Sequence, residues 1–164
     1  ISLSNDNSTK ELVTGAIEEM RSISKDLHPF QLEDIGISRA IENLINQLDE
    51  NCNDIYIFGD IDIIKQPLTQ EKEVNIFRII QECLNNIIKH SKAKSAKISL
   101  IHHDNHINII IKDNGIGFDF SEKYNDFKSL GLKTIKERVK LLKGSLKIDS
   151  NKNEGTIFTI ILPD

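Results

Sequence analysis

The chain has 164 residues, of which 38% are hydrophobic and 28% charged, and its formal net charge is −4. This length suggests one domain, or one domain with an appendage, and the interspersed charges leave no basic stripe that would favour nucleic acid as a partner. Cys52 and Cys83 lie far apart, so we expect reduced thiols rather than a disulfide or a zinc site. No apolar run is long enough to span a membrane. Because the chain begins with Ile, we expect a cytoplasmic piece of a longer protein. If that protein is a membrane sensor, its membrane segments lie outside this sequence.

Residues 1–29 predict one long amphipathic helix. The sequence STKE at positions 8–11 is a capping box, which marks a helix start, and Pro29 ends the helix near His28. The apolar residues of this helix follow heptad spacing: Val13, Ile17, Met20 and Leu27. One helix cannot bury such a stripe alone, so we expect a partner helix from another chain or from sequence before Ile1. Packing on the following domain is the alternative.

The remaining residues, 30–164, alternate between helical and strand patterns. The predicted helices cover residues 37–49, 69–90 with Thr69 as N-cap, and 131–143 with Gly144 as C-cap. The predicted strands cover residues 54–59, 97–103, 106–113, 146–148 and 156–162. Residues 118–130 are polar without a clear period and predict a mobile loop. Two hairpins make the sheet mixed or antiparallel, so the fold class is α+β, a two-layer α/β sandwich with its helices on one face.

The helix over 69–90 has two chemically different faces. Apolar residues at helical spacing predict the face toward the sheet: Val74, Phe77, Leu84, Ile87 and Ile88. A polar stripe away from most of that face consists of Glu82, Asn86, Lys89 and His90. The Asn86 side-chain oxygen suits Mg²⁺, and Glu82 can hold a metal-bound water or orient an attacking group. Lys89 and His90 can donate to phosphate. For this helix alone, an ordinary solvated face is the alternative.

A second candidate element follows the strand over 106–113. Asp113 ends an Ile-rich strand, where a buried carboxylate needs a partner, and the exocyclic amine of adenine is a suitable one. Gly115 and Gly117 allow the backbone to approach a flat base or to adopt a positive φ. An ordinary Asp-Asn-Gly turn is the alternative explanation of the same residues.

Two further positions complete the candidate site. Gly131 opens a helix whose free amides are suited to phosphate, and its neighbours are candidate contacts: Ser129, Leu132 and Lys133. The hydroxyl of Thr156, on the last hairpin, can join Asp113 around a base. Alone, a loop-to-helix junction and a strand threonine have ordinary structural explanations, so the prediction depends on the joint occurrence of these motifs.

Together these motifs resemble the ATP-binding domain of sensor histidine kinases, in the GHKL superfamily that includes gyrase, the Hsp90 chaperones and MutL. Residues 77–90 (FRIIQECLNNIIKH) resemble the N box, and residues 113–118 (DNGIGF) resemble the first glycine box. Residues 131–139 (GLKTIKERV) resemble the second glycine box, and GT at 155–156 resembles the closing Gly-Thr. The QExxxN and GLxxIxER patterns are similar to the branch partnered with NarL-type response regulators. Residues 8–30 are similar to the second helix of that branch's dimerisation and phosphotransfer domain, which divides the chain into residues 1–29 and a catalytic domain over 30–164.

The resemblance implies ATP and Mg²⁺ as cofactors. It implies Asn86 as the metal ligand and Glu82 as a metal-site residue or catalytic acid/base. Lys89 and His90 would be phosphate neighbours and Asp113 the adenine reader, in a site that also includes Gly115, Gly117, Gly131, Leu132 and Thr156. The sequence departs from the family at Ser129-Leu130, where many members have glycine or histidine, and at Thr134, where many have a third glycine.

The phospho-acceptor of that family is a histidine followed by an acidic residue on a dimerisation helix, and no predicted helix here carries such a pair. His28 precedes a proline at a helix end, where we interpret it as structural. The His-Asp step at 103–104 falls in a predicted hairpin turn. Its histidines are interpreted as solvated turn residues, with adventitious metal binding as the alternative: His102, His103 and His106.

The resulting hypothesis is the ATP-binding half of a protein histidine kinase that homodimerises through its helices. It would phosphorylate a histidine upstream of this segment and act with a NarL-type response regulator. An anti-sigma-type protein-serine kinase is one alternative, although such kinases need no helical appendage. An interaction module without turnover is another, although Glu82, Asn86 and Asp113 are all intact.

Overall fold

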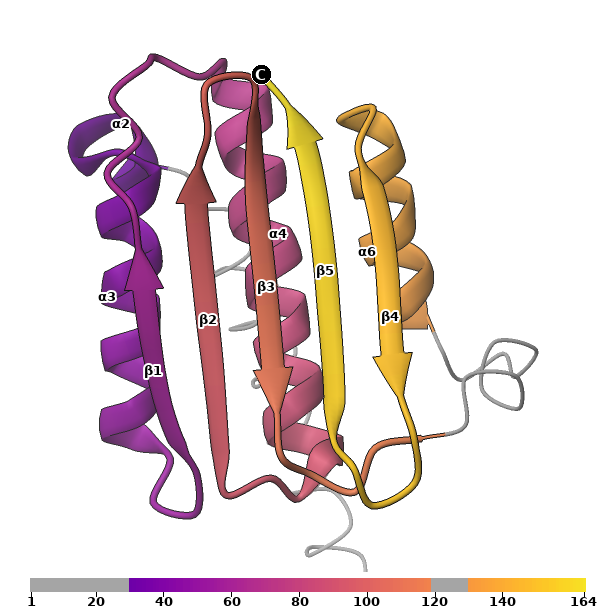
Figure 1. Cartoon of the computed structure of the whole chain (residues 1–164). Coiled ribbons are helices and arrows are strands. Elements are labelled where there is room, and N and C mark those ends of the chain that lie inside the picture. Colours follow the sequence, from indigo (N-terminus) through magenta and orange to yellow (C-terminus); the bar gives the residue numbers. More distant parts are fainter. Residues whose placement is uncertain (1–29, 119–129) are drawn as a thin grey trace, which may run out of the picture.

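The computed structural model describes residues 30–118 and 130–164 (Figure 1). In chain order the elements are α2 (Phe30–Ile35), α3 (Ile37–Asn51), β1 (Tyr56–Ile61), α4 (Gln70–Asn86), η1 (Ile87–Ser91), β2 (Ser95–His102), β3 (His106–Asp113), α6 (Leu130–Leu141), β4 (Ser145–Ser150) and β5 (Thr156–Pro163). The predicted N-terminal helix, most of the predicted loop at 118–130, His28 and Ser129 lie outside the described residues.

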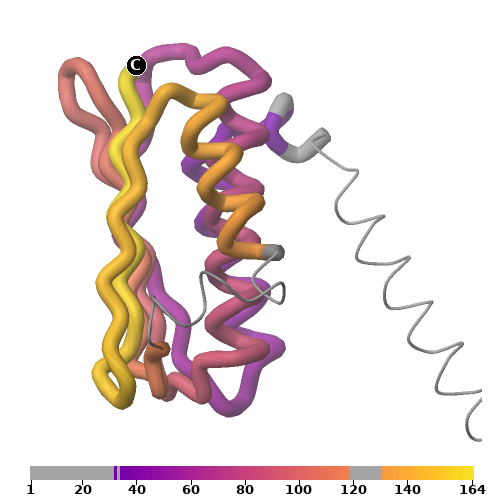
Figure 2. The backbone as a smooth tube through the Cα atoms, turned by 90° about the vertical axis from the view of Figure 1, so that its right-hand side faces the viewer, coloured from indigo at the N-terminus to yellow at the C-terminus, as the bar shows by residue number. Residues whose placement is uncertain are grey.

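The five strands form one mixed sheet in the order β1-β2-β3-β5-β4. β1 runs parallel to β2, and the other neighbouring pairs are antiparallel. The helices cover one face of this sheet, as the side view in Figure 2 shows. The predicted two-layer sandwich is confirmed, while α2 was not expected from the sequence. This short helix packs against α3 and α4.

Strand alternation decides which residues enter the core. Every second residue of β3 is buried against the helices, and the series runs Ile107, Ile109, Ile111 and Asp113. Fully burying each of these isoleucines contributes roughly 1.5–3 kcal/mol of stability. Because Asp113 continues the same series, its carboxylate faces the helix layer rather than solvent.

α4 begins as predicted but buries a different stripe. The Thr69 hydroxyl accepts a hydrogen bond from Lys72 N at 3.3 Å, which confirms the N-cap. Leu84 and Ile87 are buried as expected, whereas the other three predicted core residues are only partly buried: Val74, Phe77 and Ile88. The buried stripe instead consists of Ile76, Ile79, Ile80, Cys83, Leu84 and Ile87. α4 contacts α3 on one side and α6 on the other, so its apolar arc is wide and its centre cannot be located from spacing alone.

Both helices that frame the candidate site end differently from expectation. α4 stops at Asn86 and continues as the π-helical turn η1, which is closed by Lys92 at φ 53°. At the end of α6 the left-handed residue is Lys143, at φ 56°, rather than Gly144. The N–H of Gly144 donates to Val139 O at 2.9 Å, in a Schellman arrangement. Glycine is needed at 144 because a Cβ there would lie 2.6 Å from the backbone oxygen of Ile161.

Candidate functional site

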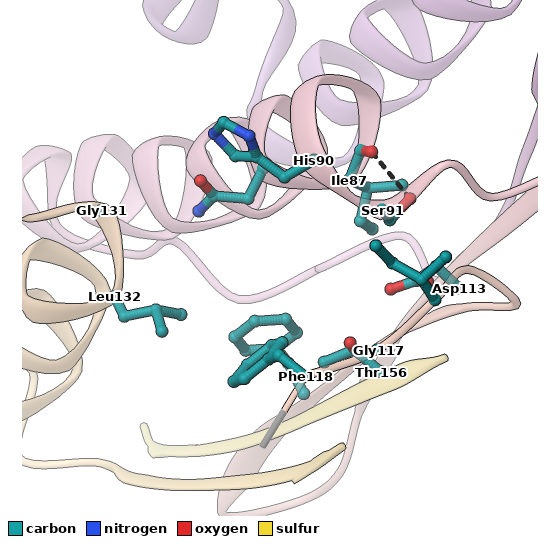
Figure 3. Close-up of a pocket in the computed structure, with 12 residues that line it drawn as sticks. Ile87, His90, Ser91, Asp113, Gly117, Phe118, Gly131, Leu132 and Thr156 are labelled. Atoms are coloured by element: carbon teal, nitrogen blue, oxygen red, sulfur yellow. Dashed lines mark hydrogen bonds between the residues drawn. The ribbon is translucent and has the colours of Figure 1, made fainter. Parts of the chain in front are cut away.

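A cleft of about 300 Å³ opens between the C-terminal end of β3, the start of β5, the η1 turn and the beginning of α6. This volume lies at the lower end of the range for small-molecule sites, roughly 300–1,000 Å³. Figure 3 shows Asp113 and Thr156 on the strand side and His90 on the helical side of this cleft. Its lining consists of Asn86, Ile87, His90, Ser91, Asp113, Ile116, Gly117, Phe118, Gly131, Leu132, Thr156 and Phe158.

The strand side of the cleft contains a buried carboxylate. Asp113 is 2% exposed, and its partner across the β3–β5 ladder is Thr156, which is 4% exposed. Gly115 N–H donates to Asp113 Oδ1 at 2.7 Å, and Thr156 donates from its backbone and its hydroxyl. Burial raises the pKa of the Asp113 carboxyl group, and these hydrogen bonds partly oppose the rise. The result is a strong acceptor held in a largely apolar pocket.

The loop after Asp113 is packed too tightly for any side chain at its glycines. A Cβ at Gly115 would lie 2.7 Å from Ser91 Cβ, and Gly117 adopts φ 55° beside Asn151. Ile116 N–H donates to Ser91 O at 2.7 Å, which ties the loop to η1. Gly117 therefore lines the cleft, whereas Gly115 lies outside its lining and acts through its N–H bond to Asp113.

The helical side of the cleft continues into a polar groove of about 490 Å³ between α4 and α6. All four residues of the predicted polar stripe line this groove: Glu82, Asn86, Lys89 and His90. Asn86 Nδ2 lies 3.4 Å from Glu82 Oε1 and donates to it, which leaves the amide oxygen of Asn86 as an acceptor. Lys89 and His90 are exposed at the rim.

The beginning of α6 closes this end of the site. A Cβ at Gly131 would overlap Glu82 Oε1 and lie 3.1 Å from Asn86 Nδ2, so glycine lets α6 approach α4 without displacing these two side chains. The N-terminal amides of α6 thus lie beside the polar stripe, where the helix dipole favours an anion. Gly131 and Leu132 line the cleft, while Thr134 lines only the groove.

Several residues of the site were not singled out from the sequence. Ser91 and Phe158 line the cleft, and Asn114 Oδ1 accepts from the backbone N–H of Lys94 and Ser95 at 2.9 and 2.8 Å. Ser150 bonds to the cleft-forming backbone through Phe118 N–H. Asn in a DNG step is a signal for loop anchoring, because its side chain readily binds nearby backbone. The serines carry no comparable signal.

The described residues offer no ready-made metal cage, because no group of three His, Cys, Asp or Glu side chains in them is placed to hold a metal ion. The His103 and His106 rings stack at 4.5 Å between centroids, and His102 Nε2 lies 3.4 Å from Asp164 Oδ2. These histidines lie at the end of β3 opposite to Asp113 (Figure 1). None of the helices in 30–118 and 130–164 is long and apolar enough to cross a bilayer.

Several curated proteins are similar to this sequence. The signal transduction histidine-protein kinase/phosphatase DegS of Brevibacillus brevis is 33% identical over 156 residues, which cover 94% of this chain and 39% of DegS. The sensor histidine kinase ComP of Bacillus subtilis is 34% identical over 145 residues, covering 88% of this chain and 19% of ComP. The oxygen sensor histidine kinase NreB of Staphylococcus carnosus is 29% identical and covers 98% of this chain and 46% of NreB. The chain thus spans less than half the length of these relatives.

Solved structures share the fold at low identity. The blue-light activated histidine kinase of Erythrobacter litoralis EL346 superposes with a TM-score of 0.72 at 18% identity, covering 89% of this chain and 49% of that one. The histidine kinase AdeS of Acinetobacter baumannii gives 0.65 at 19% identity, covering 93% of this chain and 82% of that one. The sequence pattern described as "Histidine kinase-, DNA gyrase B-, and HSP90-like ATPase" matches residues 71–164, the segment that carries both sides of the cleft. The chain therefore belongs to the family of histidine kinase-, DNA gyrase B- and HSP90-like ATPases.

Proposed function

We propose that this chain is the ATP-binding catalytic part of a two-component sensor histidine kinase. The observation that carries the proposal is the pairing of two unlike ends, one in the cleft and the other in the polar groove that continues it. The buried carboxylate of Asp113 and the hydroxyl of Thr156 lie at one end. At the other end, beside the N-terminus of α6, lie the side chains of the polar stripe: Glu82, Asn86, Lys89 and His90. A nucleotide needs this combination, because its base is flat and neutral and its phosphates are anionic.

Asp113 would select adenine. Its carboxylate accepts hydrogen bonds, so it suits the exocyclic amine of adenine. Guanine has a carbonyl at that position, which cannot donate a hydrogen bond to the carboxylate. A site of this kind discriminates strongly, because the wrong ligand leaves a buried polar group unpaired. Thr156 and Gly115 support the carboxylate, while Gly117 lets the backbone approach the base.

The polar stripe would bind the phosphates and the cation. The Asn86 amide oxygen fits Mg²⁺, which prefers oxygen ligands and keeps several waters. Lys89 would neutralise phosphate charge, and His90 would donate a hydrogen bond beside it, together with the amides of Gly131 and Leu132. When bound, Mg-ATP supplies the phosphoryl group that is transferred. The Glu82 carboxylate, oriented by Asn86 Nδ2, would accept the proton of the attacking imidazole.

The remaining assignments extend beyond this segment. Residues 1–29 would form the second helix of a dimerisation and phosphotransfer domain, and residues 30–164 the catalytic domain. The acceptor histidine would lie upstream, the intact protein would be a homodimer in the cytoplasm or facing it, and its partner would be a NarL-type response regulator. The names and lengths of the similar sensor kinases support this assignment.

A nucleotide titration tests the proposal. The isolated chain should bind ATP in preference to GTP, and Mg²⁺ should strengthen ATP binding. Equal affinity for the two nucleotides would refute the role of Asp113, and no binding of either nucleotide would refute the function itself. The dimer assignment has its own test, because light scattering of the intact protein should report twice the mass of one chain.

A further inference from the structure

Ser150, at the end of β4, links two parts of the cleft without lining it. Its Oγ accepts a hydrogen bond from Phe118 N at 3.0 Å and lies 3.0 Å from Thr156 Oγ1. Strand register explains this position, because Ser150 pairs with Thr156 across β4–β5, and Thr156 pairs with Asp113 across β5–β3. Three polar side chains from three neighbouring strands thus form one row at the end of the sheet.

When Asp113 is ionised, the two ends of this row set the direction of the hydrogen bonds between them. A backbone N–H can only donate, so Ser150 Oγ accepts from Phe118. An ionised carboxylate can only accept, so Thr156 Oγ1 donates to Asp113 and has its lone pairs left for the proton of Ser150. Each group of the row therefore donates to the next one: Phe118 N–H to Ser150, Ser150 to Thr156, and Thr156 to Asp113. Hydrogen bonds in such a chain polarise and strengthen one another.

One competing acceptor makes the row sensitive to Ser150. The carbonyl oxygen of Gly155 lies 3.1 Å from Ser150 Oγ, so the single hydroxyl proton is shared between this carbonyl and Thr156. Without Ser150, Phe118 N–H loses its acceptor, and the Thr156 hydroxyl loses the donor that holds it in the orientation pointing at Asp113. Phe118 and Thr156 both line the cleft, so both changes reach the ligand site.

We propose that Ser150 is a positioning residue for base selection: it fixes the Thr156 hydroxyl as a donor to Asp113 and holds the backbone of Phe118 against β4. The inference rests on the proposed nucleotide site and adds a residue that touches neither base nor phosphate. It predicts a specific defect. Loss of the Ser150 hydroxyl should weaken the choice between bases more than it weakens the fold.

The test compares the ratio of ATP to GTP affinity in three variants of the full chain. Ser150→Ala should lower this ratio by roughly three- to tenfold, the size expected from losing one partly buried hydrogen bond. Ser150→Thr, which keeps the hydroxyl and suits a strand, should restore the ratio. Ser145→Ala makes the same chemical change at the exposed other end of β4 and should leave the ratio unchanged. Thermal melts of each variant report folding separately.

The same substitution in a chain without the Thr156 hydroxyl separates a positioning role of Ser150 from a general structural role. In a Thr156→Val chain, Ser150→Ala should lower the ATP-to-GTP ratio by much less than it does in the unaltered chain, because the effect that passes through the Thr156 hydroxyl is already lost. An equal drop in both backgrounds would contradict the role assigned to that hydroxyl. If Ser150→Ala proves unfolded, Ser150→Cys, with a weaker donor of similar size, should give an intermediate ratio.

Two outcomes would overturn the inference alone. One is an unchanged ratio in folded Ser150→Ala while the unaltered chain still prefers ATP. The other is an equal loss of affinity for both nucleotides with a lowered melting temperature, which would mark a merely structural serine. Failure of the unaltered chain to bind any nucleotide would instead overturn the proposed function and, with it, this role of Ser150.

Discussion

Asp113 occupies the most demanding environment of any carboxylate in the described residues. It continues the inward-facing series of β3 after three isoleucines, and water reaches only 2% of its surface. A charge in such a place is unfavourable until a ligand group or a hydrogen bond compensates for it. The Gly115 and Thr156 donors compensate in part, and an adenine amine would add a further donor.

Asp113→Asn should therefore weaken ATP binding by about 2 kcal/mol or more, since breaking a buried charged hydrogen bond has this cost. GTP binding should change much less, so the preference between the nucleotides should collapse. Isothermal titration with both nucleotides measures this directly. An Asn variant that keeps the ATP preference would show that another group reads the base.

The raised pKa of Asp113 also predicts a pH effect on stability. The folded state holds this proton more tightly than the unfolded chain, so the contribution of Asp113 to the free energy of unfolding is greatest below its unfolded pKa, about 3.9. That contribution falls as the pH rises through the raised folded pKa. The melting temperature of Asp113→Asn, minus that of the unaltered chain, should thus increase from about pH 4 to neutrality. A difference that shrinks with rising pH would contradict the desolvation argument.

Asn86 should separate metal dependence from folding. Asn86→Ala removes the amide oxygen from the cleft without touching the buried stripe of α4, so most of the Mg²⁺ dependence of ATP binding should disappear while the melting temperature stays similar. Titrations with and without Mg²⁺ give the answer. Asn85→Ala, one position away, is the control, because Asn85 lines the groove but not the cleft. An equal effect of both changes would point to the groove rather than to one ligand.

The elements differ in how far sequence could predict them. The strand at 106–113 has the predicted bounds, because its short Ile-rich run is typical of a strand and a turn precedes it. The end of α6 was harder, because Lys143 adopts the left-handed conformation while Gly144 serves a close contact with β5. Such contacts depend on which strand lies beneath the helix, and the local sequence of the helix does not indicate that strand.

Leu84 provides the counterpart to Asn86 on the same helix. It is fully buried, so Leu84→Ala should lower the free energy of unfolding by about 2–5 kcal/mol, the usual range for removing a core leucine. Denaturant unfolding measures the loss, and nucleotide affinity of the remaining folded protein should change little. If Leu84→Ala and Asn86→Ala lower the free energy of unfolding by the same amount, the assignment of the two faces of α4 is wrong.

Sequence reasoning singled out the residues at the two ends of the candidate site, but not the residues that hold them in place. The polar stripe of α4 and Asp113 stand out because each breaks an apolar pattern. Ser150 could not be predicted, since its role exists only through the strand order β3-β5-β4. That order joins residues about 40 positions apart in sequence, and spacing within a single element says nothing about it.

The positions of the histidines predict how the chain behaves by itself. The His-Asp step at 103–104 is in the turn between β2 and β3, and β3 separates it from Asp113 by about 23 Å at the usual rise per residue. We expect this chain to bind ATP without phosphorylating itself on histidine, and to transfer phosphate once a dimerisation helix with an acceptor histidine is supplied. Labelled ATP followed by acid treatment tests this, because phosphohistidine is lost in acid. Acid-labile label that vanishes in His28→Gln or His103→Gln would contradict the expectation, and acid-stable label would favour a serine kinase.

The place of β5 has a consequence for how the protein is made. β5 is the last described strand in chain order, yet it lies inside the sheet between β3 and β4. During synthesis, one edge of the Ile-rich strand β3 therefore stays unpaired until residues 156–163 have emerged from the ribosome. The cleft lacks Thr156 until the same moment. A chain released early would have an incomplete cleft and an exposed strand edge prone to pairing with other chains. Premature stops before residue 156 should thus yield insoluble product, measured by comparing the soluble and pelleted fractions with those of the unaltered chain.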